Sequence, residues 1–233
     1  MGSPAIKTFP DRQRLAAALA RRIADLITEA VRRDGRAGLA VSGGSTPAPF
    51  FDQLSQWDLP WENVVVTLVD ERWVDPGDPD ANERLVRTRL LRGRAADAAF
   101  VGLKAPAATA KEGQAACEER LAQVPRPFAA LILGMGTDGH TASLFPGAAE
   151  LPAAADPETR CTCVAVTPPA APHARLTLTL PVILDAGRIF LHITGEDKRR
   201  VLQKALQEGP AEDMPIRFIL RQQTTPLEVY WAP

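Results

Sequence analysis

The sequence is short of cysteine, of net charge and of long apolar runs, and each shortage excludes a class of protein. Its 233 residues include 27 Lys and Arg against 28 Asp and Glu, which gives a net charge of −1. No overall attraction therefore draws the chain to nucleic acid or to an anionic membrane. No uncharged apolar stretch approaches the roughly 18 residues that a membrane-spanning helix needs. We expect neither a nucleic-acid partner nor insertion into a membrane.

Cysteine usage indicates the compartment. The number of cysteines is odd (Cys117, Cys161 and Cys163), and no two of them form a C-x-x-C motif. Residues 1–4 do not start the apolar core of a signal peptide. These features predict a reduced protein of the cytoplasm. Cys161 and Cys163 are expected on one face of a strand, but together with His173 they lack the spacing of zinc ligands. We therefore expect no bound metal.

The overall composition is that of an ordinary globular protein. Hydrophobic residues make up 45 % of the chain and charged residues 24 %, which excludes wholesale disorder. The 16 glycines and 21 prolines predict many turns, which is more typical of alternating strands and helices than of a helical bundle. The length, with no convincing linker, predicts one domain over residues 1–233.

The apolar pattern predicts helices and strands that alternate along the chain. The predicted helices cover residues 11–35, 47–54, 81–91, 108–121 and 196–207. The predicted strands cover residues 38–41, 63–69, 100–103, 128–133, 161–166, 176–180, 188–194 and 227–231. Such alternation of apolar strands with helices indicates a mostly parallel sheet with helices on both faces. We expect a Rossmann-like α/β fold in which strands 39–41, 64–69 and 131–133 are neighbours in the core.

Three of the predicted strands end in polar or glycine-rich clusters. These clusters are Ser42–Thr46, Asp70–Arg72 and Gly134–His140. Ligands of open α/β sheets bind beyond the carboxyl ends of the strands. Three such clusters on one edge of a sheet therefore predict a single ligand site.

The first cluster has the features of an anion-binding loop. Gly43 and Gly44 allow the backbone to approach a ligand closely, and the following helix start offers free N–H groups to an anion. Thr46 is the expected N-cap, with Pro47 in the first helical position. The loop lacks the lysine of a nucleoside-triphosphate loop. An ordinary tight turn with a threonine cap is the alternative.

The second cluster is a run of three charges at a strand end. Such a run is usually a solvated surface. At the carboxyl end of a buried strand, however, Arg72 faces the crevice, where a guanidinium can bind an oxyanion with two hydrogen bonds.

The third cluster contains the best candidate for acid–base chemistry. Its glycines satisfy G-x-G-x-x-G, but Pro146 interrupts the long helix that a dinucleotide site requires. The loop carries His140 two residues after Asp138, an arrangement that favours proton transfer. His192 alternates with apolar neighbours and is interpreted as strand packing, while His173 lies in a proline-rich loop and is uninformative.

Two basic residues are the remaining candidates. Lys198 follows Thr194-Gly195 at another strand-to-helix junction on the expected ligand side. Arg175 opens the segment Leu-Thr-Leu-Thr-Leu180. A solvated surface charge is the default alternative for both.

Taken together, these motifs resemble the 6-phosphogluconolactonase family, in order and spacing, from about residue 9 to residue 233. The segments that carry the resemblance are Ser42-Gly-Gly-Ser-Thr-Pro47, Val69-Asp-Glu-Arg-Trp73 with Asn82 downstream, Gly134-Met-Gly-Thr-Asp-Gly-His-Thr-Ala-Ser-Leu-Phe-Pro146 and Arg175-Leu-Thr-Leu-Thr-Leu-Pro181. The wider resemblance is to glucosamine-6-phosphate deaminases and isomerases. It implies hydrolysis of 6-phospho-D-glucono-1,5-lactone to 6-phospho-D-gluconate, in the oxidative pentose phosphate pathway, without metal or organic cofactor.

The resemblance also implies roles for individual residues. His140 would be the general base that activates water for attack on the lactone carbonyl, and it would return a proton to the departing ring oxygen. Arg72 would stabilise the developing negative charge. Asp138 would orient His140 or its loop.

The substrate-binding residues are implied in the same way. Asp70 would support the sugar hydroxyls or Arg72. The phosphate would be held by the loop amides and by the basic side chains, which are Gly43, Gly44, Ser45, Thr46, Arg175 and Lys198. A δ-lactone is an activated ester, so a positioned water and a base suffice, and the chain contains no G-x-S-x-G nucleophile elbow.

Three other functions compete with this interpretation. An amino-sugar-phosphate deaminase or isomerase resembles the chain in its loops, but the carboxylate expected after the Asp-Gly-His loop is absent from Ala142–Phe145. A sugar-phosphate sensor needs a DNA-binding module, for which the residues before the first helix leave no room. A pyridine-nucleotide enzyme is disfavoured by Pro146. The expected partner is a small sugar-phosphate lactone, and the expected assembly is a monomer or weak homodimer.

Overall fold

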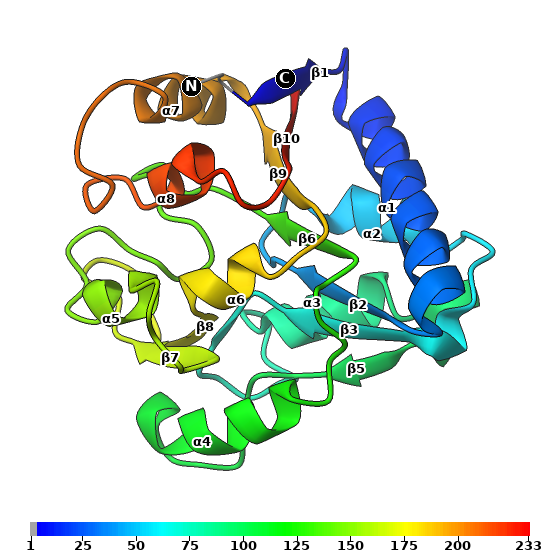
Figure 1. Cartoon of the computed structure of the whole chain (residues 1–233), viewed down its shortest axis with the longest axis horizontal. Helices are drawn as coiled ribbons and strands as arrows, with labels where there is room; N and C mark the ends of the chain where they lie inside the picture. The colour runs from blue at the N-terminus through cyan, green and yellow to red at the C-terminus, as the bar shows by residue number, and fades with distance from the viewer. Residues whose placement is uncertain (1–3) are drawn as a thin grey trace.

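Two β-sheets organise residues 4–233, the part of the chain that the computed structural model describes (Figure 1). The main sheet has seven strands in the order β1-β10-β9-β6-β2-β3-β5, and all its pairs are parallel. Its strands, in chain order, are β1 (Ala5–Thr8), β2 (Ala37–Val41), β3 (Val64–Leu68), β5 (Ala99–Val101), β6 (Ala130–Leu133), β9 (Ile189–Thr194) and β10 (Leu227–Ala232). The expected α/β fold with a mostly parallel sheet is confirmed. Residues 1–3, which carry most of the N-terminal segment used above to argue against a signal peptide, lie outside the described residues.

Eight α-helices and two short 3-10 helices occur among residues 4–233. The α-helices are α1 (Arg12–Asp34), α2 (Ala48–Leu54), α3 (Asn82–Arg89), α4 (Ala110–Leu121), α5 (Leu151–Ala155), α6 (Leu180–Leu184), α7 (Glu196–Ala205) and α8 (Ile216–Arg221). The 3-10 helices are η1 (Trp61–Asn63) and η2 (Gly93–Asp97). Helices α1 and α2 lie on one side of the main sheet, and α6 lies on the other (Figure 1).

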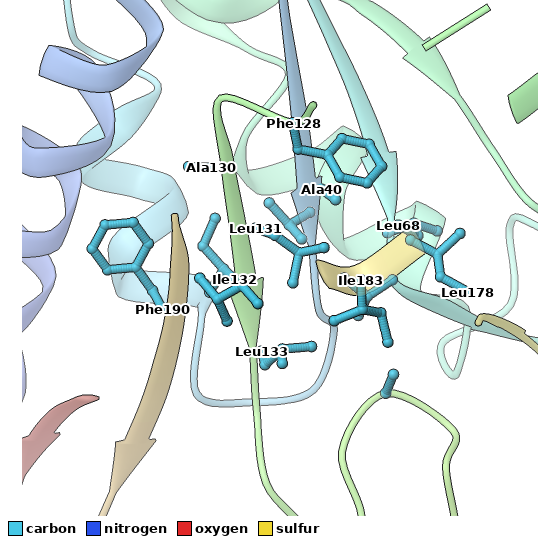
Figure 2. Packing of buried hydrophobic residues seen from close by; sticks show 14 of the residues in the cluster. Ala40, Leu68, Phe128, Ala130, Leu131, Ile132, Leu133, Leu178, Ile183 and Phe190 are labelled. Carbon is cyan, nitrogen blue, oxygen red and sulfur yellow. The ribbon is translucent and has the colours of Figure 1, made fainter. Parts of the chain in front are cut away.

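The predicted core strands are neighbours, in the order β6-β2-β3. Every residue of these three strands is buried, which agrees with their mostly apolar sequence because a parallel sheet is covered on both faces. Figure 2 shows Leu131 and Ile132 of β6 with Leu68 of β3 in the same buried cluster. Their carboxyl ends therefore point to one edge of the sheet, where the three polar clusters follow.

Helix α1 begins and ends at the residues that the sequence indicates. The Asp11 carboxylate accepts a hydrogen bond from the Arg14 backbone N–H at 2.7 Å, which satisfies one of the free N–H groups of the first turn. Gly35 ends the helix in the left-handed conformation, at φ 77°, where a side chain would be strained. One face of α1 is fully buried, and it packs against α2 and the main sheet.

The second sheet was not predicted. Strands β4 (Asp70–Arg72), β8 (Arg175–Leu178) and β7 (Cys163–Val166) form an antiparallel sheet in the order β4-β8-β7. The segments predicted as strands 161–166 and 176–180 thus exist, but outside the parallel sheet. Cys161 precedes β7 and is exposed, so the expectation that it shares a strand face with Cys163 is wrong.

Val69 joins the two sheets. Its N–H donates to the carbonyl of Val41 in the main sheet at 3.0 Å, and its carbonyl accepts from the Leu178 N–H of the second sheet at 2.9 Å. The chain therefore leaves one ladder and enters the other within a single residue. Asp70–Arg72 is a strand of its own and not the loose strand end considered from the sequence.

Several local expectations need correction. Thr46 is not an N-cap, because α2 begins at Ala48 and the residue before it, Pro47, makes no side-chain capping bond. Strand β1 and helices α5, α6 and α8 were not predicted, since each has only four to six residues and offers too few positions for a periodic pattern.

Glu71 holds the start of α3 against β4. One carboxylate oxygen accepts from the backbone N–H groups of Arg72 and Asn82 at 2.7 and 2.8 Å, and the other accepts from Glu83 N–H at 2.7 Å. The side chain thus satisfies N–H groups in the first turn of α3, which has no capping side chain of its own. Burial nevertheless raises the pKa of Glu71 to about 7, against the opposing effect of these hydrogen bonds, and Asp70 adds to the rise.

We predict that Glu71 makes folding pH-dependent. Its folded pKa of about 7 lies above the ordinary glutamate pKa of 4.5, so the unfolded chain releases this proton first as the pH rises. The free energy of unfolding should therefore fall by up to about 1.4 kcal/mol per pH unit between about pH 5 and pH 7, from this one group. In urea denaturation at a series of pH values, Glu71→Gln should lack this contribution. The exposed Glu62→Gln should retain the wild-type slope, and equal slopes for all three proteins would contradict the prediction.

Candidate active site

A cavity of about 260 Å³ opens at the carboxyl ends of β2, β3, β6 and β9. All the site residues predicted from the sequence line it, except Asp138. The predicted residues in its wall are Gly43, Gly44, Ser45, Thr46, Asp70, Arg72, His140, Arg175 and Lys198. The three polar clusters at the strand ends therefore meet in one place, as expected.

His140 is the candidate base, and Asp138 orients its imidazole. The His140 Nδ1 lies 2.6 Å from Asp138 Oδ1, and the His140 backbone N–H donates to the same oxygen at 3.1 Å. Burial acts to raise the pKa of Asp138, but the hydrogen bond and charge of His140 outweigh it and lower the pKa of Asp138. An ionised carboxylate can only accept, so in the neutral imidazole Nδ1 carries the proton and Nε2 keeps a free electron pair.

The backbone around His140 is compact and depends on Gly136. The Gly136 N–H donates to the His140 carbonyl at 2.8 Å. A Cβ on Gly136 would lie 2.1 Å from His140 Nδ1 and 2.4 Å from Asp138 Oδ1, so the pair fits only over a glycine. The imidazole also packs on Phe145, with ring centroids 4.4 Å apart. No helix follows this loop before α5, so the G-x-G-x-x-G match is not a dinucleotide fingerprint.

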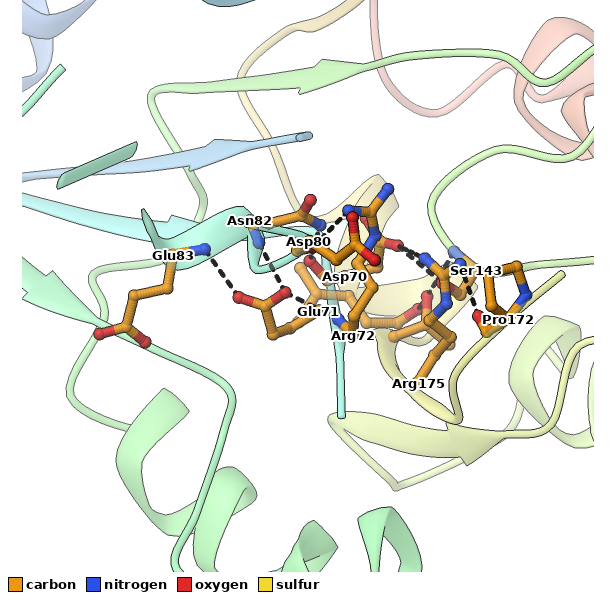
Figure 3. A network of polar contacts seen from close by, with 11 residues as sticks. Asp70, Glu71, Arg72, Asp80, Asn82, Glu83, Ser143, Pro172 and Arg175 are labelled. Atoms are coloured by element: carbon orange, nitrogen blue, oxygen red, sulfur yellow. Dashed lines mark hydrogen bonds and ion pairs between the residues drawn. The ribbon is translucent and has the colours of Figure 1, made fainter. Parts of the chain in front are cut away.

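The second sheet contributes Asp70, Arg72 and Arg175 to the wall of the cavity, and Figure 3 shows the polar contacts of these residues. Asp70 is buried and accepts from the Ser143 hydroxyl at 2.7 Å. Its carboxylate also lies 4.0 Å from a guanidinium nitrogen of Arg175. Burial lowers the pKa of Arg175, while the charge of Asp70 opposes that shift. Asp70 and Arg175 thus stand on the two paired strands β4 and β8 of the antiparallel sheet.

Three buried polar atoms in this wall have no hydrogen-bond partner among residues 4–233. They are Nε of Arg72, Nε of Arg175 and Oδ1 of Asn82. Arg72 and Arg175 are directly paired in the β4–β8 register, so two N–H donors stand side by side. Buried polar groups are normally satisfied, and these atoms together could bind the oxygens of a polyhydroxylated, negatively charged ligand.

Asn82 lies between the two sheets and shapes the glycine loop. Its amide nitrogen donates to the Asp70 carbonyl at 2.8 Å. A Cβ on Gly43 would lie 1.8 Å from Asn82 Oδ1, so the loop approaches this closely only because residue 43 is glycine. Within residues 4–233, the backbone N–H groups of residues 43–46 donate to no other backbone or side-chain atom.

Lys198 is the basic residue of the wall formed by the end of β9 and the start of α7. Burial lowers the pKa of Lys198, while the carboxylates of Asp138 and Asp197 oppose that shift. Lys198 therefore lies on the same side of the cavity as the His140–Asp138 pair. Its ammonium is available to an anion at the cavity wall.

Sequence reasoning missed four residues of the site or its support. Asn82 and Ser143 are part of the quoted motifs, yet no pattern of spacing assigned them a contact. Glu71 supports Arg72 and Asn82 through backbone N–H groups, which leave no signal in the sequence. His192 was interpreted as strand packing, but it lines the cavity. Its position near a strand end, shortly before Gly195, was the available signal.

The described residues contain neither a candidate metal site nor a candidate membrane-spanning helix. No group of three or more His, Cys, Asp or Glu side chains within residues 4–233 is arranged to hold a metal ion. His173 Nε2 lies 3.1 Å from Asp80 Oδ2, so its polar contact is not with the cysteines. Of the helices that the structure describes, none has the length and apolar character to span a membrane.

Comparisons with known proteins agree in one family. The family described as "Glucosamine-6-phosphate isomerases/6-phosphogluconolactonase" matches residues 10–231. The 6-phosphogluconolactonase of Mesorhizobium japonicum is 46 % identical, over 97 % of this chain and 94 % of its own length. The 6-phosphogluconolactonase of Rhizobium meliloti is 45 % identical, over 97 % of both chains. The crystal structure of a 6-phosphogluconolactonase from Shewanella baltica superposes with a TM-score of 0.97 at 44 % identity, and the match covers all of both chains.

We predict that Gly43→Ala disrupts the wall formed by Asn82. The new methyl group would overlap Asn82 Oδ1, so Asn82 must move and release the Asp70 carbonyl. Such overpacking should lower the free energy of unfolding by about 1–3 kcal/mol. Gly187→Ala is the matched control, because a Cβ there meets backbone atoms only at ordinary contact distances of 3.4 and 3.6 Å. Urea denaturation of both variants measures the difference, and equal stabilities would contradict the prediction.

Proposed function

The chain belongs to the glucosamine-6-phosphate isomerase/6-phosphogluconolactonase family, and from this premise we propose that its cavity hydrolyses 6-phospho-D-glucono-1,5-lactone to 6-phospho-D-gluconate. It is a lactone hydrolase of the pentose phosphate pathway, an assignment supported by curated relatives that are named 6-phosphogluconolactonase. The assignment to this cavity rests on His140, which lines the cavity with most of the other predicted site residues and whose Nδ1 lies 2.6 Å from Asp138 Oδ1.

In the proposed reaction, His140 Nε2 takes a proton from a water molecule as the water oxygen attacks the C1 carbonyl. Asp138 accepts a hydrogen bond from Nδ1–H and stabilises the imidazolium that forms. The tetrahedral intermediate then collapses and the bond between C1 and the ring oxygen breaks. His140 returns its proton to the departing ring oxygen, which becomes the 5-hydroxyl of the product. No covalent nucleophile is needed, because the lactone is an activated ester.

Arg72 is the proposed stabiliser of the oxyanion on C1. Its Nε–H is buried without a partner among the described residues, so no protein acceptor competes with the substrate oxygen. The other end of its guanidinium donates to the Asp80 carbonyl, which limits how the group can rotate. A donor that is oriented before charge develops stabilises the transition state more than the ground state.

The remaining predicted residues are proposed to bind the rest of the substrate. Gly43, Gly44, Ser45 and Thr46, with Lys198, would hold the phosphate through loop N–H groups, hydroxyls and the ammonium. Arg175 lies against Asp70 and opposite Arg72. This position supports contacts of Arg175 with the substrate close to the lactone ring, in addition to the phosphate contact expected from the sequence. Asp70 would orient Arg175 and accept from a sugar hydroxyl.

The competing functions are less well supported. An amino-sugar-phosphate deaminase or isomerase needs a further carboxylate after the Asp-Gly-His loop, whereas Ser143 occupies that stretch and donates to Asp70. The similarity to a monomeric glucosamine-6-phosphate deaminase, at 20 % identity and a TM-score of 0.78, concerns the fold alone. A sensor without catalysis would have no use for an oriented histidine–carboxylate pair.

The protein is also proposed to act in the cytoplasm as one domain and as a monomer or weak homodimer. Its three cysteines are free, and two of them are buried. Among residues 4–233 the exposed large hydrophobic side chains are Ile6 and Leu206. Two such residues offer little apolar area for a stable dimer interface.

We predict that the purified protein hydrolyses the phosphorylated lactone and that His140→Asn lowers turnover by roughly 10²- to 10⁴-fold. The loss should appear in kcat much more than in KM, after correction for spontaneous ring opening. The exposed His173→Asn is the matched control and should keep wild-type turnover. Glucosamine 6-phosphate is the substrate control. Near-wild-type turnover of a folded His140→Asn variant, or faster release of ammonia than lactone opening, would sink this assignment.

We predict a separate role for Lys198. Lys198→Ala should raise KM for the phosphorylated lactone by roughly 10- to 100-fold, the equivalent of about 1.5–3 kcal/mol for a lost charge-assisted hydrogen bond. The change should shrink for glucono-1,5-lactone, which carries no phosphate. Lys204→Ala on the same helix α7, where the side chain is exposed, is the control. Equal losses on both substrates would show that Lys198 does not bind the phosphate.

A further inference from the structure

His192 is the one histidine of the cavity that the proposed reaction does not use. It lies near the carboxyl end of β9 and lines the cavity. The residue is 5 % exposed, so the protein encloses almost all of its surface. Burial alone lowers the pKa of His192, to about 4. The imidazole is therefore uncharged at neutral pH, in contrast to the basic side chains around it.

The imidazole of His192 lacks protein partners. Nδ1 is buried and has no hydrogen-bond partner within residues 4–233, and Nε2 makes none with these residues either. A neutral imidazole carries one N–H donor and one acceptor nitrogen. An unpaired buried polar group is costly, and in a native protein it usually has a ligand or a water as its partner. Packing alone therefore does not explain a histidine at this position, where a leucine or phenylalanine would avoid the cost.

The surroundings of His192 fix both its orientation and its place in the cavity. Its ring meets the edge of Phe50 of α2, with centroids 6.2 Å apart and planes at 86°. The next residues of β9 are held by β10, because the Gly195 N–H donates to the Ala232 carbonyl at 2.8 Å. Helix α2 follows the glycine loop, and α7 with Lys198 follows β9. His192 thus lies between the two segments that are proposed to hold the phosphate.

We propose that His192 is a substrate-binding residue that donates a hydrogen bond from its neutral imidazole to the phosphate group of the substrate. The proposal rests on the proposed function and deepens it, because it assigns a specificity-determining residue to the same cavity. A phosphate monoester at neutral pH is mostly dianionic and offers acceptors only. It therefore needs donors on every side, and His192 supplies one where neither the loop nor Lys198 does.

A neutral donor has an advantage over another cation in this position. A charge buried in the sheet core would carry a large desolvation penalty when no ligand is bound. An uncharged imidazole avoids most of that penalty, yet its bond to a charged phosphate oxygen is still charge-assisted. The result is selectivity for phosphorylated over unphosphorylated lactones, with the additional donor held rigid by Phe50 and the β9 backbone.

Kinetics of two variants test the proposal. His192→Phe keeps a planar ring against Phe50 but removes both nitrogens, and it should raise KM for the phosphorylated lactone roughly tenfold while kcat changes less than about twofold. The KM for glucono-1,5-lactone should not change. His192→Gln restores an amide donor and should recover part of the affinity, whereas a packing role would favour the phenylalanine. Unchanged KM in folded His192→Phe, or an equal rise for both lactones, would overturn the proposal.

A second measurement uses the unaltered protein and so does not depend on a variant that folds. The chain has three histidines, so their imidazole NMR signals can be assigned from single variants. Inorganic phosphate and 6-phosphogluconate should shift the His192 signals, and gluconate should not, while His173 serves as the internal reference. No response of His192 to either phosphate probe would overturn the proposal.

The two measurements also separate this inference from the proposed function. A protein that opens no lactone, but whose His192 responds to phosphate, would disprove the proposed reaction and keep the phosphate site. An active enzyme whose His192 ignores phosphate would keep the reaction and disprove the site.

Discussion

The architecture of the site depends on two hydrogen bonds of one residue. Val69 donates to the main sheet and accepts from the second sheet, so the chain changes ladders without a loop. This change places Asp70 and Arg72 on a short strand beside the cavity, in the second sheet and not in the main sheet. A flexible connection at this point would leave both side chains free to rotate in water. The rigid one gives them fixed directions before any ligand arrives, which is the basis of electrostatic preorganisation.

Around this junction the protein buries several polar groups in one network. Glu71 satisfies the backbone of α3, Asp70 pairs with Ser143 and Arg175, and Asn82 spans the gap between β4 and the glycine loop. Such groups cost free energy when they leave water, and the network recovers only part of that cost. What remains near this junction is three atoms without a partner among residues 4–233, namely Arg72 Nε, Arg175 Nε and Asn82 Oδ1, in residues that line the cavity. Stability is thus given up at the place where a ligand can restore it.

The parts of the fold that could be predicted are those with long periodic or continuous apolar patterns. Helix α1 and strands β2, β3 and β6 belong to this group, and with them the sheet edge that collects the candidate residues. The second sheet could not be predicted, because β4 is three charged residues whose pairing with β8 depends on contacts a hundred residues apart in sequence. Thr46 shows the limit of local rules, since Pro47 and Ala48 start the helix without it. His192 shows the same limit for sites: alternation with apolar neighbours describes its strand correctly but does not show that the imidazole lines the cavity.

The position of β10 has a consequence for how the chain is made. This last strand in chain order lies between β9 and β1, which is the first. During synthesis, β1 emerges early, but β10, its partner in the described sheet, is made only after the other strands of that sheet. The β6-β2-β3 core can assemble before β10 is made, so the edge of β9 stays open until then. Premature termination would therefore yield a partly folded chain with an unpaired parallel edge, a form prone to aggregate and to be recognised by chaperones.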